Sequence, residues 1–135
     1  MKFLDLAGAQ RLWNALTQRA SAGLVQLQSS GDWVFWTSGS AFEAFYTKAD
    51  VSLSITTADG GVYRSDLQTL TLPAAITGAG TVAIKHAEIN CAGGSNACWA
   101  ALAGTSSTGV TWHAASGASR TTNCLVTAKI MGTIS

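Results

Sequence analysis

Apolar residues near the start of the chain recur at the spacing of an amphipathic helix. Their stripe has steps of three or four residues and consists of Leu6, Ala9, Trp13, Leu16 and Ala20, and Leu12 widens it. Asp5 is a suitable N-cap, and Gly23 ends the pattern. Because a helix of two heptads is marginal alone, this stripe needs a partner. Residues 1–22 are therefore predicted to form a docking or oligomerisation helix.

After Gly23 the pattern changes to the period of two that is typical of strands. Val51, Leu53 and Ile55 alternate with polar residues, and the ADGG sequence at residues 58–61 predicts a hairpin turn. Further strands are expected at 24–28, 32–36, 62–64, 70–72, 81–89, 97–102, 109–114 and 123–134, with a Gly-rich loop at 90–96. The pattern predicts a mainly β chain with a short N-terminal helix, in which residues 23–135 form one β-sandwich or jelly-roll-like domain.

The sequence DWVFW at residues 32–36 carries apolar side chains on both faces of its predicted strand. Trp33 and Phe35 point one way, whereas Val34 and Trp36 point the other way. A strand of this kind is buried on both faces. We therefore expect Trp33, Phe35 and Trp36 to contribute to a subunit interface as well as to a core.

Charge is scarce, which narrows the classes of function. Charged residues make up 11% of the chain, against about 25% in an average domain, and the net charge is +1. This balance argues against nucleic-acid binding. Between Ile89 and Ser135 only Arg120 and Lys129 are charged, which favours a subunit interface.

No apolar run is long enough to span a membrane, and polar residues interrupt any N-terminal export signal.

The three cysteines, Cys91, Cys98 and Cys124, are an odd number. Secreted disulfide scaffolds usually carry even sets, so reduced thiols packed as small apolar groups are the favoured interpretation. A Cys91–Cys98 disulfide remains an alternative, as does a metal site that includes His86 or His113. The usual paired spacing of zinc ligands is absent.

Catalytic motifs are also missing from the sequence. Neither a G-x-S-x-G elbow nor a phosphate-binding loop occurs, and Asp59 and Asp66 fit solvated turn positions. We therefore expect no enzymatic activity and no cofactor.

The five tryptophans leave a carbohydrate-binding role open, which would require Trp33, Trp36 or Trp112 to be exposed beside polar groups.

The N-terminal pattern resembles a segment at the start of many tailed-bacteriophage virion proteins. Phe3, Leu4, Asp5, Gly8 and the pair Leu12-Trp13 match its form F-L-D-x-x-G-x-x-x-L-W. The resemblance covers about residues 3–20. It implies a homotrimer attached to the capsid or tail, assembled in the bacterial cytoplasm with reduced cysteines. The early stop at Gly23 favours a compact knob over an extended fibre.

Together these features predict a non-enzymatic structural protein of a phage virion. The expected role is a capsid decoration (cement) protein or short head fibre, bound as a trimer to the major capsid protein or another virion protein. Its docking or trimer contacts are assigned to Leu6, Ala9, Leu12, Trp13 and Leu16. The alternative is a tail-associated module that binds a host receptor glycan.

Overall fold

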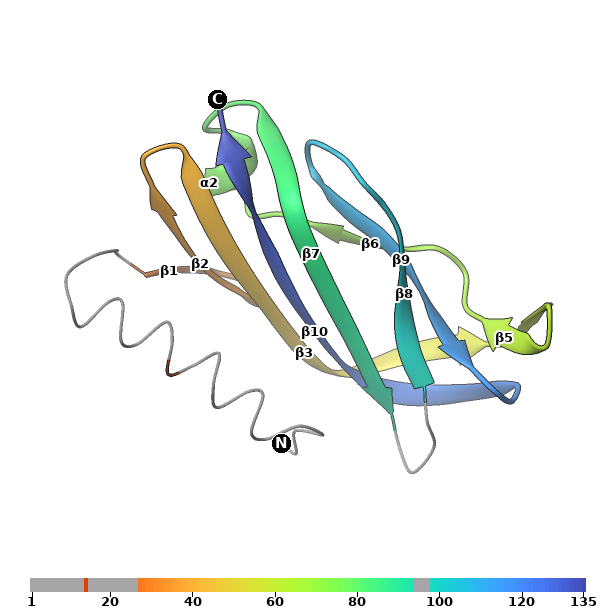
Figure 1. Ribbon diagram of the computed structural model, residues 1–135. Helices are drawn as coiled ribbons and strands as arrows, with labels where there is room; N and C mark the ends of the chain where they lie inside the picture. Colours follow the sequence, from red (N-terminus) through yellow and green to blue (C-terminus); the bar gives the residue numbers. More distant parts are fainter. Residues whose placement is uncertain (1–13, 15–26, 94–97) are drawn as a thin grey trace.

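In the computed structural model, the residues described are 14, 27–93 and 98–135, and most of them lie in antiparallel strands. The first of two five-stranded sheets has the order β1-β2-β3-β10-β7. Its strands are β1 (Gln28–Ser30), β2 (Trp33–Ser38), β3 (Ala41–Ile55), β10 (Arg120–Ile134) and β7 (Val82–Gly93). Figure 1 shows β3, β10 and β7 running side by side along the length of the molecule.

The second sheet is built around β9. The short strands β5 and β6 pair with successive parts of one edge of β9, β8 pairs with the other edge, and β4 extends the sheet beyond β5. These strands are β4 (Thr57–Asp59), β5 (Val62–Arg64), β6 (Gln68–Thr71), β8 (Cys98–Thr105) and β9 (Gly109–Ser116). The sequence prediction of a mainly β fold is therefore confirmed.

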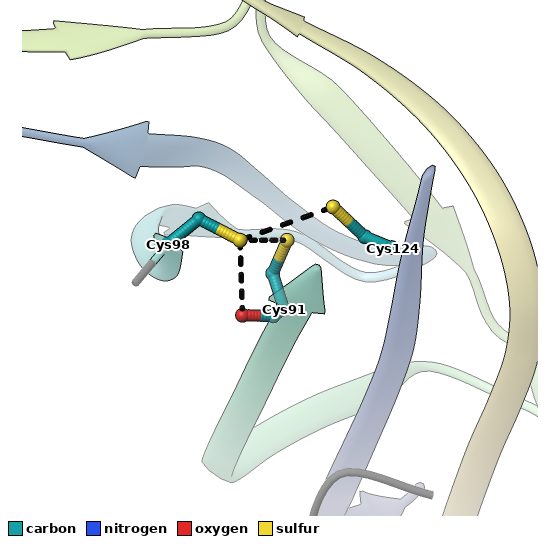
Figure 2. Close-up of side chains that lie close together, drawn as sticks. All are labelled: Cys91, Cys98 and Cys124. Atoms are coloured by element: carbon teal, nitrogen blue, oxygen red, sulfur yellow. Dashed lines mark hydrogen bonds between the residues drawn. The ribbon is translucent and has the colours of Figure 1, made fainter. Parts of the chain in front are cut away.

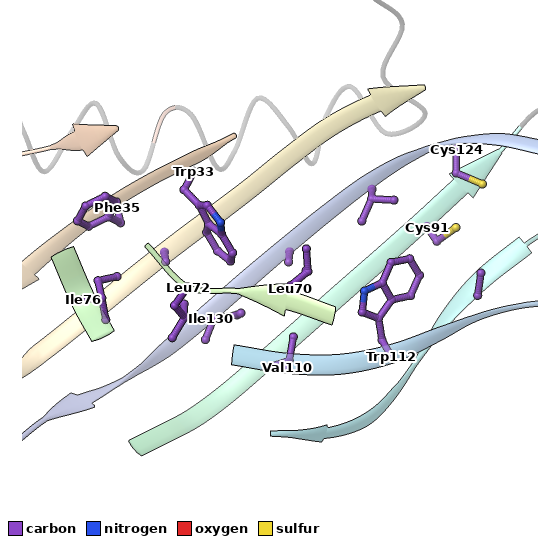
Figure 3. Close-up of a cluster of buried hydrophobic side chains, with 14 of the residues drawn as sticks. Trp33, Phe35, Leu70, Leu72, Ile76, Cys91, Val110, Trp112, Cys124 and Ile130 are labelled. Atoms are coloured by element: carbon purple, nitrogen blue, oxygen red, sulfur yellow. The ribbon is translucent and has the colours of Figure 1, made fainter. Parts of the chain in front are cut away.

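A single core lies between the two sheets (Figure 3). The first sheet supplies large side chains such as Phe35, Phe42 and Ile130, each at most 1% exposed. The second sheet supplies Val110 and Trp112 from β9, which are equally inaccessible to solvent. The buried residues of β10 occur at alternate positions, so the period-two pattern of this strand directs one of its faces into the core. This packing makes the body a sandwich of two sheets.

The strand from Ala41 to Asp50 is a difference from the sequence prediction, which recognised only the part after Val51. The run from Phe42 to Phe45 is buried on both faces and includes Glu43, so it does not alternate. The Lys129 Nζ lies 3.8 Å from the Glu43 Oε1 across the β3–β10 pair. The local sequence pattern does not explain why the carboxylate of Glu43 is buried. Lys129, which is distant in the sequence but lies on the neighbouring strand, supplies the opposite charge that offsets this burial.

Two further segments differ from the expectation. Residues 90–93, expected in a loop, continue β7 and pair with β10, because Cys91 points into the core and is fully buried. Pro73 ends β6 as expected, but a short helix, α2 (Ala74–Thr77), then places Ile76 in the core. The tip of β7 and the C-terminus meet beside it, where the amide of Thr81 donates to the carbonyl of Ser135.

Apart from Asn14, the predicted N-terminal helix lies outside the described residues, and with it Leu6, Ala9, Leu12, Trp13 and Leu16. Their docking or trimer role stays a prediction. Within the described part of the chain, no helix has the length and apolar content needed to cross a membrane.

Gly132 provides a test of how closely β3, β10 and β7 approach one another. A Cβ atom on this residue would overlap the backbone carbonyl oxygen of Ala83 and lie 2.9 Å from the ring of Phe42. We expect Gly132→Ala to destabilise the fold by about 1–3 kcal/mol in urea unfolding. The matched control is Gly117→Ala, whose Cβ would meet open space, and its stability should stay within about 1 kcal/mol of the parent. Equal stabilities for the two variants would contradict this packing.

Candidate functional site

The described tryptophans differ sharply in exposure. Trp33 and Trp112 are only 7% and 2% exposed, because β2 and β9 direct them into the core. Trp36 is half-buried on the opposite face of its sheet, whereas Trp99 is 43% exposed. The expectation that Trp33 or Trp112 would be exposed for glycan binding is therefore wrong. Trp99 is the indole that the second sheet presents to solvent.

The candidate interface residues of β2 separate in the same way. Trp33 and Phe35 belong to the core of the chain itself, whereas Trp36 lies on the face that also carries Val34. The alternation expected from DWVFW is therefore present. Of the three residues, Trp36 is the one on the face turned away from the core, and its interface role stays a prediction.

The exposure of Trp99 follows from the alternation along β8. Cys98 and Ala100 pack against the core, so Trp99 and Ala101 must point to the outer face of the second sheet. The sequence placed Trp99 in a strand, but the small alanines around it gave no sign of which face would be buried. To predict that Trp99 faces solvent, one must know that β8 lies at the edge of its sheet. Only the strand order gives this position.

Trp99 belongs to a row of residues that crosses three strands. It is opposite Ala115 of β9, and Ala115 is opposite Arg64 of β5. Side chains directly opposite each other in antiparallel strands have Cβ atoms about 5 Å apart. The small methyl group of Ala115 therefore separates a large aromatic ring from a guanidinium group. We call this outer surface, formed by Trp99, Ala101, His113, Ala115, Arg64 and Asp59, the Trp99 face.

The polar groups of this face are held in place yet remain accessible. The Arg64 guanidinium lies 3.5 Å from the Asp59 carboxylate across the β4–β5 hairpin, and both side chains are about half exposed. An exposed pair of this kind contributes little stability, so its hydrogen-bonding groups remain available to a ligand. The expected turn at residues 58–61 is present, and it brings these two charges together.

His113 is fixed by the backbone of the neighbouring turn. Its Nδ1 lies 2.9 Å from the carbonyl oxygen of Ser65, and because a carbonyl only accepts, Nδ1 carries the proton. In the neutral ring, Nε2 is then an acceptor. Ser65 is itself buried, and its hydroxyl accepts a hydrogen bond from the amide of Ala114. The imidazole of the Trp99 face therefore has a defined tautomer and orientation.

An exposed indole beside a cation, a carboxylate and an imidazole acceptor is suited to binding an amphipathic ligand. The ring offers an apolar surface, and the neighbouring groups offer both donors and acceptors. Asp59 is engaged by Arg64, and Asp66 lies in the turn after β5, where its backbone carbonyl accepts from the Ser65 hydroxyl. These positions suit recognition of hydroxyl groups on a sugar.

A second cluster lies at the end of the core, where the two sheets meet. Figure 2 shows the side chains of Cys91, Cys98 and Cys124 pointing toward one another from β7, β8 and β10. The Sγ atom of Cys98 is 3.9 Å from that of Cys91 and 3.9 Å from that of Cys124. All three are free thiols, so the Cys91–Cys98 disulfide stays a prediction.

Burial sets the protonation of this cluster. It raises the pKa of Cys91 well above its usual range and the pKa of Cys124 to about 11, because a thiolate loses its hydration there. The thiol of Cys98 donates to the backbone carbonyl of Cys91 over 3.7 Å. Neither histidine belongs to the group, since His86 contacts Glu88 at 3.3 Å and His113 contacts Ser65. The expected alternative of a metal site containing a histidine is therefore wrong for the described residues.

Comparison with known proteins gives a match of fold. No family model matches the chain, and no curated protein sequence matches it. A solved structure of the Pseudomonas aeruginosa R1 pyocin fibre, comprising its C-terminal residues 323–701, is similar over 87% of this chain with a TM-score of 0.54 and 18% identity. An N-truncated R1-type pyocin tail fibre is similar over 87% of this chain and 95% of its own length, with a TM-score of 0.51 and 14% identity. The chain spans 31% of the first of these structures.

The contrast between Trp112 and Trp99 can be tested through stability. We expect Trp112→Ala to cost about 3–5 kcal/mol, because it removes a buried ring that both sheets contact. Trp99→Ala should change stability by about 1 kcal/mol or less, since much of its ring already faces solvent. Urea unfolding of the two variants measures both values. A loss at Trp99 as large as that at Trp112 would place Trp99 in the core rather than on a binding surface.

Proposed function

We propose that the chain is a non-enzymatic module of a phage-type tail fibre that binds bacterial surface polysaccharide through the Trp99 face. Two independent features support this proposal. The sandwich has the fold of pyocin fibre structures over most of its length. In addition, the most exposed tryptophan of the described chain lies among donors and acceptors rather than alone. The second feature carries the binding role, since the fold alone does not specify a ligand.

The chemistry of the Trp99 face suits a polysaccharide better than a protein surface. A sugar ring has one apolar face, which can stack on the indole, and equatorial hydroxyls that can bond to Arg64 and Asp59. The face lies on paired strands rather than on a long loop, so its groups are positioned before binding and lose little entropy. A repeating polysaccharide would compensate for modest affinity at one site through several copies of the chain.

A tail position is favoured over the capsid decoration or head fibre expected from the sequence. Both similar structures are fibre fragments of pyocins, and neither is a capsid protein. The resemblance of residues 3–20 to phage virion proteins is compatible with either position. We therefore assign the chain to a virion or virion-like particle, with attachment through its N-terminal segment and recognition through its β body.

Self-association into a trimer is part of the proposal. Few charges occur from β8 onward, which leaves a weakly charged surface for contact with other copies. A trimer would also present three Trp99 faces to one polysaccharide. Light scattering of the full chain should give about three times its 13.9 kDa mass. A monomer at micromolar concentration would contradict the trimer while leaving the binding role of Trp99 intact.

The binding role predicts a specific loss of affinity. We expect at least one polysaccharide in a panel of bacterial surface glycans to bind the full chain, and Trp99→Ala to weaken that binding by about tenfold or more. Tryptophan fluorescence or calorimetric titration provides the measurement. The matched control is Leu102→Ala, which removes an exposed apolar side chain of the same strand on the opposite face. Undiminished binding by Trp99→Ala, or no binding by the parent to any glycan of the panel, would refute the proposal.

A further inference from the structure

We propose that Cys91, Cys98 and Cys124 bind one soft metal ion of the Zn²⁺ class through their three thiolates. Each residue comes from a different strand, and the ion would join β7 and β10 of the first sheet to β8 of the second. This site lies in the interior, away from the Trp99 face. It is independent of the glycan-binding role and is separately testable.

The spacing of the sulfur atoms supports a shared ligand. A Zn–S bond of about 2.3 Å places two thiolates of a tetrahedral site about 3.8 Å apart. Two of the sulfur pairs are separated by 3.9 Å, and all three Sγ atoms lie within 4.8 Å of one another. The third pair consists of the Sγ atoms of Cys91 and Cys124. A small movement of these two atoms toward each other is therefore sufficient to complete a three-thiolate site, without any change in strand pairing.

The backbone around the cluster leaves room for these sulfurs. Gly93 pairs with Cys124 in the β7–β10 ladder, and a Cβ atom at Gly93 would lie 2.8 Å from the Cys124 Sγ. Any larger residue would therefore displace this sulfur from its present position. Cys91 lies on the same inward face of β7, two positions earlier. Glycine is thus needed beside the cluster for a steric reason, even though its φ is not in the left-handed region.

The ligand set indicates the kind of ion. Thiolates are soft ligands that select ions such as Zn²⁺ and Cu(I) over Mg²⁺ or Ca²⁺. In the described residues no histidine or carboxylate joins the three cysteines, so a fourth position would be filled by solvent from the side of half-buried Cys98. Three thiolates and one Zn²⁺ ion together carry a net charge of −1. Burying this single charge costs less than burying three thiolates without a metal ion.

Binding would replace three S–H bonds by three metal–sulfur bonds and release up to three protons, with no change in oxidation state. The ion would fasten the two sheets to each other at the end of the core opposite α2, where Cys98 is the contribution of β8.

The test uses the full chain, fully reduced, with Zn²⁺ as the probe. Mass spectrometry under native conditions should detect one Zn²⁺ per chain. With free Zn²⁺ at about 100 times the Kd, the melting temperature should rise by about 5–10 °C. Co²⁺ substituted for Zn²⁺ should show thiolate-to-metal charge-transfer bands of an intensity that corresponds to three sulfur ligands. Absence of binding, or a Co²⁺ spectrum with fewer than three thiolates, would overturn the proposal.

Cys98→Ser provides the decisive variant because Cys98 is only half-buried, so its replacement should leave the metal-free fold intact. We expect this variant to lose at least 100-fold in Zn²⁺ affinity with an unchanged metal-free melting temperature. Leu102→Ser is the matched control on the same strand and should bind Zn²⁺ as the parent does. Unchanged affinity in Cys98→Ser would refute the site. If that variant does not fold, the Co²⁺ spectrum of the parent still decides.

Discussion

The pairing of β3 with β10 is the contact on which the remaining structure depends. Each strand is 15 residues long, and the two run antiparallel from Ala41 opposite Thr133 to Ile55 opposite Arg120. One face of this pair carries much of the core, including Ala44 and Ile130, and β2 and β7 add to its two edges. At its far end, β10 brings Cys124 beside β7 and toward Cys98 of the second sheet. The pairing of β3 with β10 therefore positions both the core and the cysteine cluster.

The second sheet determines which side chains the outer surface of the sandwich carries. β9 lies against the first sheet through Val110, Trp112 and Ala114, so every alternate residue of β9 and β8 must face outward. This parity, rather than a loop, exposes Trp99 and leaves His113 partly exposed, and the β4–β5 hairpin adds Arg64 and Asp59 at the edge. Burial of the inner face of the second sheet thus determines which side chains lie on its outer face. The same parity directs Cys98 inward, next to the exposed Trp99.

Several features were accessible from the sequence because they depend on local patterns. The alternation at Val51–Ile55, the turn at residues 58–61 and the two-faced strand at Trp33 all reflect side-chain parity or turn chemistry. The features that were missed depend on partners distant in the chain. Residues 41–50 form a strand because β10, about eighty residues later, pairs with them. Whether Trp99 or Trp112 faces the core depends on strand order, and the approach of Cys124 to Cys98 depends on how the sheets pack.

We propose that a fibre-type sandwich presents the Trp99 face to a polysaccharide. NMR titration of the isotopically labelled full chain with a binding polysaccharide tests this proposal directly. We expect the resonances of the Trp99 indole, the Arg64 guanidinium and the His113 ring to shift together, while those of the Trp33 and Trp112 indoles do not shift. Shifts confined to other surfaces, with Trp99, Arg64 and His113 unchanged, would contradict it.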